Sequence, residues 1–262
     1  MTWNINHNLV LGGAILLFLI LYLGFDKVPP KQKDLEKSRL MNIESTGISN
    51  LVRDAMDKLE PEKKSIIEAI EIDLEKTGSD TINRIERLKS LSGTWFEYGF
   101  PSIAGSYAED IAVISGNESD WSMAGTTYAL CVKKAVDLKE KEFCSKRSVK
   151  AFENAISIAP EKIEPRINLA ICYVDNPAQD NPMQGILMLR ELNAKYPENV
   201  AVMNQLAKLA LQTNQIDRAL GRLETAINLE PENQTTICLL AKAYKSAGNQ
   251  KKAIEFEKKC VN

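Results

Sequence analysis

Histidine is almost missing from this chain of 262 residues, because His7 is the only one. Nucleophile–histidine triads, histidine-based metal sites and most proton-transfer designs need a histidine close to other polar groups. His7 instead stands in a short polar segment near the N-terminus, just before a long apolar run. The sequence therefore predicts no catalytic residues, no metal site and no cofactor.

Other signatures of chemistry are also missing. Residues 99–106, GFPSIAGS, contain two glycines but lack the lysine and the spacing of a phosphate-binding loop. Glu140 and Glu142 are explained more simply as solvated helix faces than as paired catalytic carboxylates. The net charge is −2, and no basic stripe with interleaved aromatic residues is present, so we expect no nucleic-acid partner. A catalytic subunit with unrecognised residues stays as an alternative.

Cysteine is scarce and shows no recognisable pairing. The chain contains Cys131, Cys144, Cys172, Cys238 and Cys260. They are odd in number, form no CxxC pair, and in two cases fall on apolar helix faces. We therefore expect small buried hydrophobic residues in a reducing compartment. A disulfide between Cys131 and Cys144 is the less favoured alternative.

One long apolar run is present, from Leu9 to Phe25, with the sequence LVLGGAILLFLILYLGF. As an α-helix it would span about 26 Å, near the lower limit for a hydrocarbon core of ~30 Å. A cleaved signal peptide is the alternative, but it would need a basic segment before the run, and residues 1–8 contain no Lys or Arg. We predict an uncleaved transmembrane helix that places Leu9 to Phe25 in a lipid bilayer.

Positive charge follows the apolar run and does not precede it. The cations are Lys27, Lys31, Lys33, Lys37 and Arg39. The positive-inside rule then predicts a single-pass membrane protein whose C-terminal part lies in the cytoplasm. The opposite orientation is the alternative.

Three prolines, Pro160, Pro197 and Pro231, end segments that share one pattern. Each is followed by a small-residue pair: Leu169-Ala170, Leu206-Ala207 and Leu240-Ala241. The last two pairs are 34 residues apart, as are the last two prolines. A fixed period with a proline at each junction is typical of an array of helical hairpins, in which alanine lets neighbouring helices approach closely.

At these residues, and at Trp121-Ser-Met-Ala-Gly-Thr-Thr-Tyr128, the chain resembles the tetratricopeptide repeat (TPR) family. The resemblance is strong over residues 121–262, about four repeats, and weak over residues 81–117. It implies an all-α protein in which a right-handed α-solenoid follows the transmembrane helix. It also implies a bacterial scaffold or adaptor that binds protein partners and is not an enzyme.

The resemblance and the N-terminal run divide the chain into four parts. They are an N-terminal tail with its anchor (1–27), a helical spacer (28–80), a degenerate helical hairpin (81–120) and the TPR solenoid (121–262). Within the spacer we expect a helix that opens at Pro61 and ends before Gly78, with Asp80 capping the next helix. An insert, roughly residues 132–146, is expected to lengthen its hairpin.

In TPR arrays the first helices of successive hairpins line a concave groove that holds a peptide. The resemblance implies a groove formed by Asn168, Ile171, Asn204, Lys208, Lys242 and Lys245. Lys208 and Lys242 occupy equivalent places in adjacent repeats, which suits an acidic or carboxylate-bearing segment. Solvated lysines without a ligand are the alternative.

The last repeat ends inside its second helix, where solenoids normally need a polar cap. We expect this end to be covered by a partner or by a second copy in a homo-oligomer, or else to be solvated by its lysines. The function predicted from these features is a membrane-anchored TPR scaffold or adaptor. An envelope-assembly factor that faces away from the cytoplasm is the second hypothesis.

Overall fold

The structure, a computed structural model, describes residues 47–260 and has only helices and connecting loops in that range. The predicted anchor, its charged flank and the first part of the spacer lie outside the described residues. None of the described helices is both long enough and apolar enough to cross a bilayer. From Leu51 onward the described residues form one compact unit.

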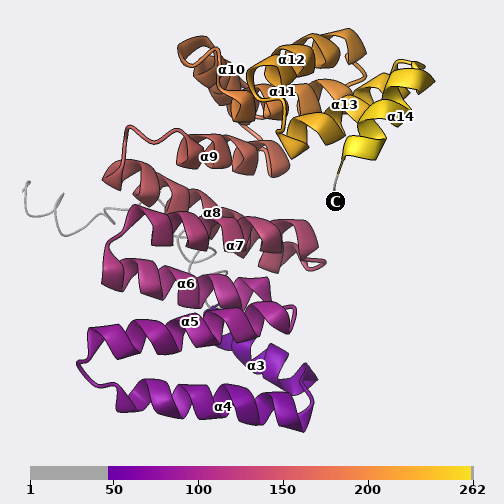
Figure 1. The fold of residues 1–262 in the computed structure, drawn as a ribbon. Coiled ribbons are helices and arrows are strands. Elements are labelled where there is room, and N and C mark those ends of the chain that lie inside the picture. The colour runs from indigo at the N-terminus through magenta and orange to yellow at the C-terminus, as the bar shows by residue number, and fades with distance from the viewer. Residues whose placement is uncertain (1–46, 261–262) are drawn as a thin grey trace, which may run out of the picture. The chain divides into compact units, whose positions relative to one another are not determined.

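The described residues form twelve helices. The first six are α3 (Ile48–Lys58), α4 (Pro61–Lys76), α5 (Thr81–Glu97), α6 (Pro101–Ser115), α7 (Glu118–Lys134) and α8 (Leu138–Ile158). The last six are α9 (Glu164–Asp175), α10 (Gln184–Lys195), α11 (Val200–Gln212), α12 (Ile216–Leu229), α13 (Gln234–Ser246) and α14 (Gln250–Lys259). Successive helices from α4 onward pack side by side as hairpins, and each hairpin packs on the next (Figure 1). The all-α, TPR-like hairpin architecture is as predicted.

Local signals set the helix ends in the predicted spacer. Pro61 stands at the start of α4, where its missing N–H costs nothing. Gly78 follows the helix with a φ of 53°, in the left-handed region that favours glycine. Asp80 caps α5, because its carboxylate accepts a hydrogen bond from the backbone N–H of Asn83 at 3.1 Å.

The three repeat prolines stand where the period predicts. Pro160, Pro197 and Pro231 each lie two residues beyond the last residue of α8, α10 and α12. The paired residues that follow are all buried: Leu169, Ala170, Leu206, Ala207, Leu240 and Ala241. Ala226 of α12 is fully buried against Val200 and Met203 of α11. Each hairpin therefore uses alanine where its helices cross.

The predicted insert lengthens its hairpin. Helix α7 has 17 residues and α8 has 21, whereas α9 and α10 have 12 each. Upstream, α5 and α6 form a hairpin with its own core, which includes fully buried Trp95 and Leu91.

The prediction of free thiols is wrong for four of the five cysteines. Disulfides join Cys131 to Cys144 and Cys238 to Cys260, and Cys172 is buried and free. In each pair one cysteine lies on the first helix of a hairpin, and the other lies in or directly after the second helix. The Cα atoms are 6.0 and 4.9 Å apart, within the range that a disulfide spans. The pairing of Cys131 with Cys144 was the less favoured alternative, whereas the pairing of Cys238 with Cys260 was not predicted.

Candidate functional site

A shallow cleft lies between the first helices of two successive hairpins. Helix α9 contributes Ile171, Val174 and Asp175, helix α11 contributes Gln205, Lys208, Leu209 and Gln212, and Leu189 of α10 lies beneath. The enclosed volume is about 20 Å³, enough for about one water molecule. The enclosed space therefore cannot hold a small molecule, and a segment of a partner would lie across its open side.

The cleft combines an apolar floor with polar groups at its edge. Ile171, Val174 and Leu209 are partly buried and pack on the core between α9, α10 and α11. Lys208 is exposed at the rim. The Asp175 carboxylate in the same cleft is 3.4 Å from the ammonium of Lys133, so part of its charge is neutralised. The chemistry suits a segment with an apolar side chain and a neighbouring carboxylate.

The structure brings together only some of the predicted groove residues. Ile171 and Lys208 line the same cleft, and Asn168 lies on α9, about one turn before Ile171 and half-buried. Lys242 and Lys245 are exposed on α13, on the next hairpin. Lys245 lies 3.7 Å from the Glu257 carboxylate in an exposed ion pair, which contributes little to stability.

Asn204 does not face the groove, contrary to the prediction. It is only 3% exposed, and its amide nitrogen donates a hydrogen bond to the Thr236 hydroxyl at 2.9 Å. Thr236 is itself fully buried on α13. Asn204 therefore links α11 to α13, because a buried amide needs a partner and the next hairpin supplies one.

The sequence prediction missed Gln205, which lines the cleft beside Lys208. The repeat register contained the necessary signal, because Gln205 stands in the position equivalent to Asn168. Val174 and Gln212 also line the cleft. They lie toward the C-terminal ends of α9 and α11.

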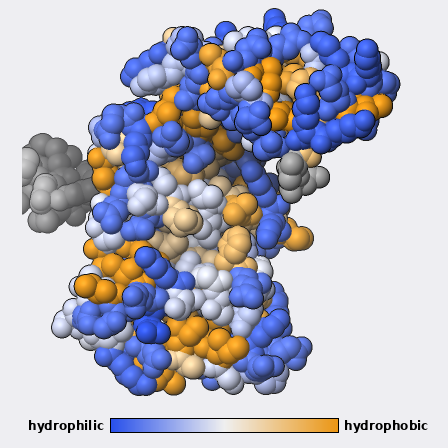
Figure 2. Space-filling view, viewed as in Figure 1, coloured by the Kyte–Doolittle hydropathy of each residue, from blue (hydrophilic) through white to orange (hydrophobic). Residues whose placement is uncertain are grey.

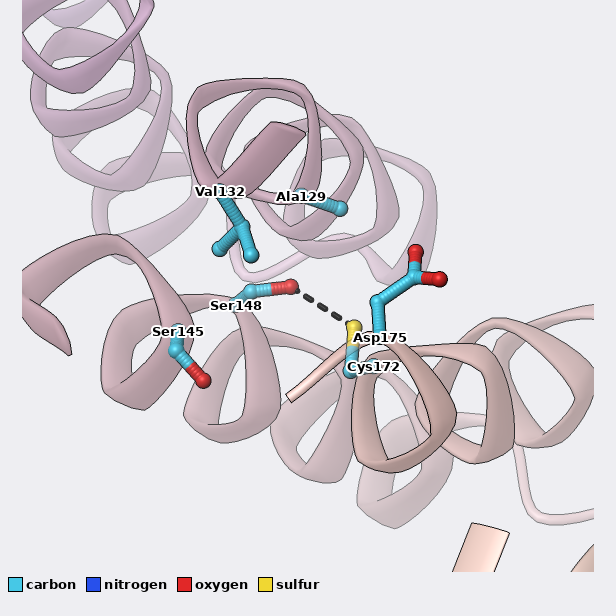
Figure 3. A pocket seen from close by; sticks show the side chains of 6 residues that line it. All are labelled: Ala129, Val132, Ser145, Ser148, Cys172 and Asp175. Atoms are coloured by element: carbon cyan, nitrogen blue, oxygen red, sulfur yellow. Dashed lines mark hydrogen bonds between the residues drawn. The ribbon is translucent and has the colours of Figure 1, made fainter. Parts of the chain in front are cut away.

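A second, smaller cavity surrounds the free thiol (Figure 3). Cys172 projects from α9 toward α8, where its Sγ is 2.9 Å from the Ser148 hydroxyl oxygen. Ala129, Val132, Ser145 and Asp175 complete the lining, and the volume is about 10 Å³. Burial raises the pKa of the Cys172 thiol to about 11, so the thiol stays protonated at neutral pH. A protonated, buried thiol is a poor nucleophile, and this cavity is therefore a packing feature.

No group of three or more His, Cys, Asp or Glu residues within residues 47–260 is arranged to hold a metal ion. The cleft between α9 and α11 is the candidate site, because residues from the first helices of two successive hairpins line it.

Comparison with known proteins supports the fold. A thermophilic TPR protein from Thermus thermophilus superposes with a TM-score of 0.50 at 15% identity, over 77% of this chain and 99% of that one. BtubC (BKLC) from P. vanneervenii gives 0.47 at 16% identity, over 77% and 90%. MamA (residues 41 to the end) from Desulfovibrio magneticus RS-1 gives 0.42 at 15% identity, over 67% and 92%.

The match to a protein-family model covers less of the chain than the structural similarities do. Residues 177–259 match the family model of the bacterial transcriptional activator domain, which is less than half of the chain. No curated protein matches. The comparisons therefore establish a TPR-like helical repeat structure.

Proposed function

We propose that this chain is a non-catalytic scaffold that binds an extended segment of a protein partner in the cleft between α9 and α11. The observation that carries the proposal is the convergence of Ile171, Gln205 and Lys208, from the first helices of two successive hairpins, on one open cleft. Ile171 receives an apolar side chain, Gln205 hydrogen-bonds to the partner backbone, and Lys208 pairs with a carboxylate. Lys242 continues the basic rim onto α13.

The lysines can be tested without disturbing the core. Lys208 and Lys242 are both exposed, so Lys208→Ala with Lys242→Ala leaves the packing unchanged. Exposed ion pairs contribute about 0.2–1 kcal/mol each, so we expect a several-fold loss of partner binding and not its abolition. Binding should also weaken with added salt, because exposed charges are screened over ~8 Å at physiological ionic strength.

The experiment uses a photo-crosslinking amino acid at Gln205 of the full-length protein in its native cells, with one at the exposed Thr225 position of α12 as control. The expected result is a crosslinked partner from position 205 only. That crosslink should weaken in the Lys208→Ala, Lys242→Ala variant and persist in the control Lys251→Ala, Lys258→Ala. Equal crosslinking from both positions, or no effect of the lysines, would refute binding in the cleft.

The two disulfides favour the orientation in which the repeats face away from the cytoplasm. Disulfides persist in oxidising compartments and are rare in the cytoplasm of most organisms. We propose that the repeats lie on the side of the membrane away from the cytoplasm, anchored by Leu9 to Phe25. The flanking lysines argue for the cytoplasmic side, but the expectation of unpaired cysteines in a reducing compartment does not hold for four of the five cysteines.

Counting thiols decides between the orientations. Cells are quenched in acid, and the unfolded protein is alkylated without reductant and weighed by mass spectrometry. One alkylated cysteine, Cys172, is expected from an oxidising compartment. Five alkylated cysteines would place the repeats in a reducing compartment and restore the cytoplasmic orientation.

The match to the transcriptional activator domain is consistent with a binding role. The matched residues make up the repeat helices α10 to α14. Two of these helices, α10 and α11, line the cleft together with α9. On our proposal these helices contact protein and not nucleic acid.

A further inference from the structure

The connection between α7 and α8 exposes apolar side chains that the fold does not use. Val136 is 97% exposed and Leu138 is 79% exposed, the two largest values among the exposed large hydrophobic residues of the described chain. Figure 2 shows hydrophobic atoms projecting at the right-hand edge, where Figure 1 places this connection. We call residues 133–141, KKAVDLKEK, the α7–α8 tip.

The base of the tip is held firmly, so the exposure is built into the fold. The disulfide between Cys131 and Cys144 joins α7 to α8 directly behind it, and both cysteines are fully buried. Ala135 and Phe143 pack inward on this base, together with Tyr128. The inward side of the connection thus has its own small core, while Val136 and Leu138 point away from it.

Lysines surround the apolar pair. The tip contains Lys133, Lys134, Lys139 and Lys141 against two carboxylates, and of these lysines Lys133 is paired with Asp175 of α9 at 3.4 Å. Both carboxylates are hydrogen-bonded: Asp137 accepts a hydrogen bond from the backbone N–H of Lys139 at 3.1 Å, and Glu140 accepts one from the Ser102 hydroxyl of α6 at 2.6 Å. The tip therefore has a net positive charge, and one of its two carboxylates, Glu140, bonds to α6.

A neighbouring helix extends the patch. The ammonium of Lys134 lies 5.5 Å from the centre of the Phe96 ring, and that ring is 40% exposed at the end of α5. Apolar groups from two hairpins thus lie beside lysine ammonium groups on one edge of the solenoid. Projecting apolar side chains with flanking lysines suit a flat interface that is apolar inside and anionic at its surface.

We propose that the α7–α8 tip docks on an anionic lipid surface, with Val136 and Leu138 inserted at the interface and the lysines against the headgroups. The apolar pair projects and does not line a cavity, which favours a bilayer over a ligand that needs a pocket. Lysine stems can lie along the interface while their ammonium groups stay hydrated. Each lysine near an anionic surface contributes about 1 kcal/mol, so the contact holds an already anchored protein close to the membrane and does not replace an anchor.

A tryptophan placed at the tip reports the contact locally, in the full chain. Val136→Trp is compared with Val113→Trp, a matched change at a residue that is 65% exposed near the far end of α6, beside the start of α7 and away from the tip. Both proteins are reconstituted in vesicles of phosphatidylcholine alone or mixed with phosphatidylglycerol, with brominated lipid as quencher. Any insertion by residues 9–25 is the same in both variants, so the difference between them isolates the tip.

The expected result is additional blue-shifted, lipid-quenched emission for Val136→Trp in the anionic vesicles, above the quenching of the native tryptophans that both variants share, and no such addition for Val113→Trp. Adding Lys134→Gln and Lys139→Gln should reduce the quenching to the level seen in phosphatidylcholine alone. Equal quenching of the two tryptophan variants, or quenching of the tip that does not depend on anionic lipid or on these lysines, would overturn the proposal. A tip that becomes shielded only when a protein partner is added would likewise reject a lipid surface in favour of a protein contact.

Discussion

The hairpins from α5 to α8 and those from α9 to α14 have the same architecture but different cores. The first group has helices of 15 to 21 residues and buries Trp95, Tyr128 and Phe152 completely. The second group has helices of 10 to 14 residues, and its core consists mainly of leucine and alanine. The 34-residue spacing of the proline and the Leu-Ala pair occurs in the second group, where small residues fill each crossing. In the first group, aromatic side chains fill part of the core and the helices are longer, so this spacing is lost although the hairpins remain.

The two groups also bury polar groups differently. Between α6, α7 and α8 the Glu109 carboxylate accepts hydrogen bonds from Arg147 at 2.9 Å and from the Tyr128 hydroxyl at 3.0 Å. Between α11 and α13 the neutral pair Asn204 and Thr236 forms the buried link. A charged group in the first core must remain paired, whereas the second core has no such requirement.

The largest expected effect is the loss of stability when a buried glycine is replaced by alanine, which we compare between the two groups. A Cβ at Gly185 of α10 would come within 2.4 Å of the Ala170 carbonyl oxygen, which is backbone of α9 and cannot move aside. At Gly125 of α7 the nearest atoms belong to the Phe152 ring, at 2.9 Å, and a ring can shift. We expect Gly185→Ala to cost about 3 kcal/mol and Gly125→Ala about 1–2 kcal/mol, measured by urea unfolding.

The control for this pair is Gly221 of α12, where a Cβ would meet nothing within 4 Å. Gly221→Ala should stabilise the protein by about 0.5–1 kcal/mol, because alanine favours a helix interior. If Gly125→Ala proves as costly as Gly185→Ala, the aromatic core is as rigid as a backbone contact, and the contrast between the two groups fails.

A second change tests the alanine crossings of the later hairpins. Ala226 is fully buried, so Ala226→Leu should overpack its contact with Val200 and Met203 and cost about 1–3 kcal/mol. The same leucine at exposed Lys251 of α14 should change stability by no more than ~0.5 kcal/mol. Thermal melting compares the two, and coinciding melting temperatures would show that the repeat register is misassigned.

The charged core of the earlier hairpins gives the third prediction. Arg147→Ala leaves the Glu109 carboxylate, whose side chain is 12% exposed, without its cation, and should cost about 1–3 kcal/mol. The variant Arg147→Ala with Glu109→Gln should recover part of that loss, because an amide needs no counter-ion. Chemical denaturation measures the stability of both variants. If the Arg147→Ala protein is as stable as the parent, water hydrates the Glu109 carboxylate well enough to replace the lost cation.

The smallest effect concerns the thiol at the boundary between the two groups. The pKa of Cys172 is raised from its ordinary value of 9.0 to about 11, chiefly because the thiol is buried. Below pH 9 the folded and unfolded thiols are both protonated, so this group does not alter the pH dependence. Between pH 9 and 11 the unfolded thiol loses its proton first, so stability falls as pH rises, on the order of 1 kcal/mol.

Cys172→Ala removes this group, and its unfolding free energy should fall less steeply than the parent's across that pH range. Lysines and tyrosines titrate in both proteins and cancel in the comparison. Parallel pH profiles for the two proteins would show that the thiol is open to solvent.

The candidate site was predictable in part. The repeat register identified Ile171 and Lys208, because surface positions recur with the same period as the core. It misplaced Asn204, since a polar residue on a first helix can face either the groove or the next hairpin, and only packing decides between them. Gln205, one residue later, is the side chain that lines the cleft.

The sequence by itself determined the helices, their ends and the alanine crossings from Pro160 onward. These features depend on local rules: proline ends a helix, asparagine or aspartate caps one, and a small residue recurs where helices meet. Only the tertiary structure decided which cysteines pair, that Glu109 is paired inside the core, and that Val136 and Leu138 remain outside it. Each of those outcomes depends on which side chains face one another across neighbouring helices, and helix spacing along the chain does not specify that.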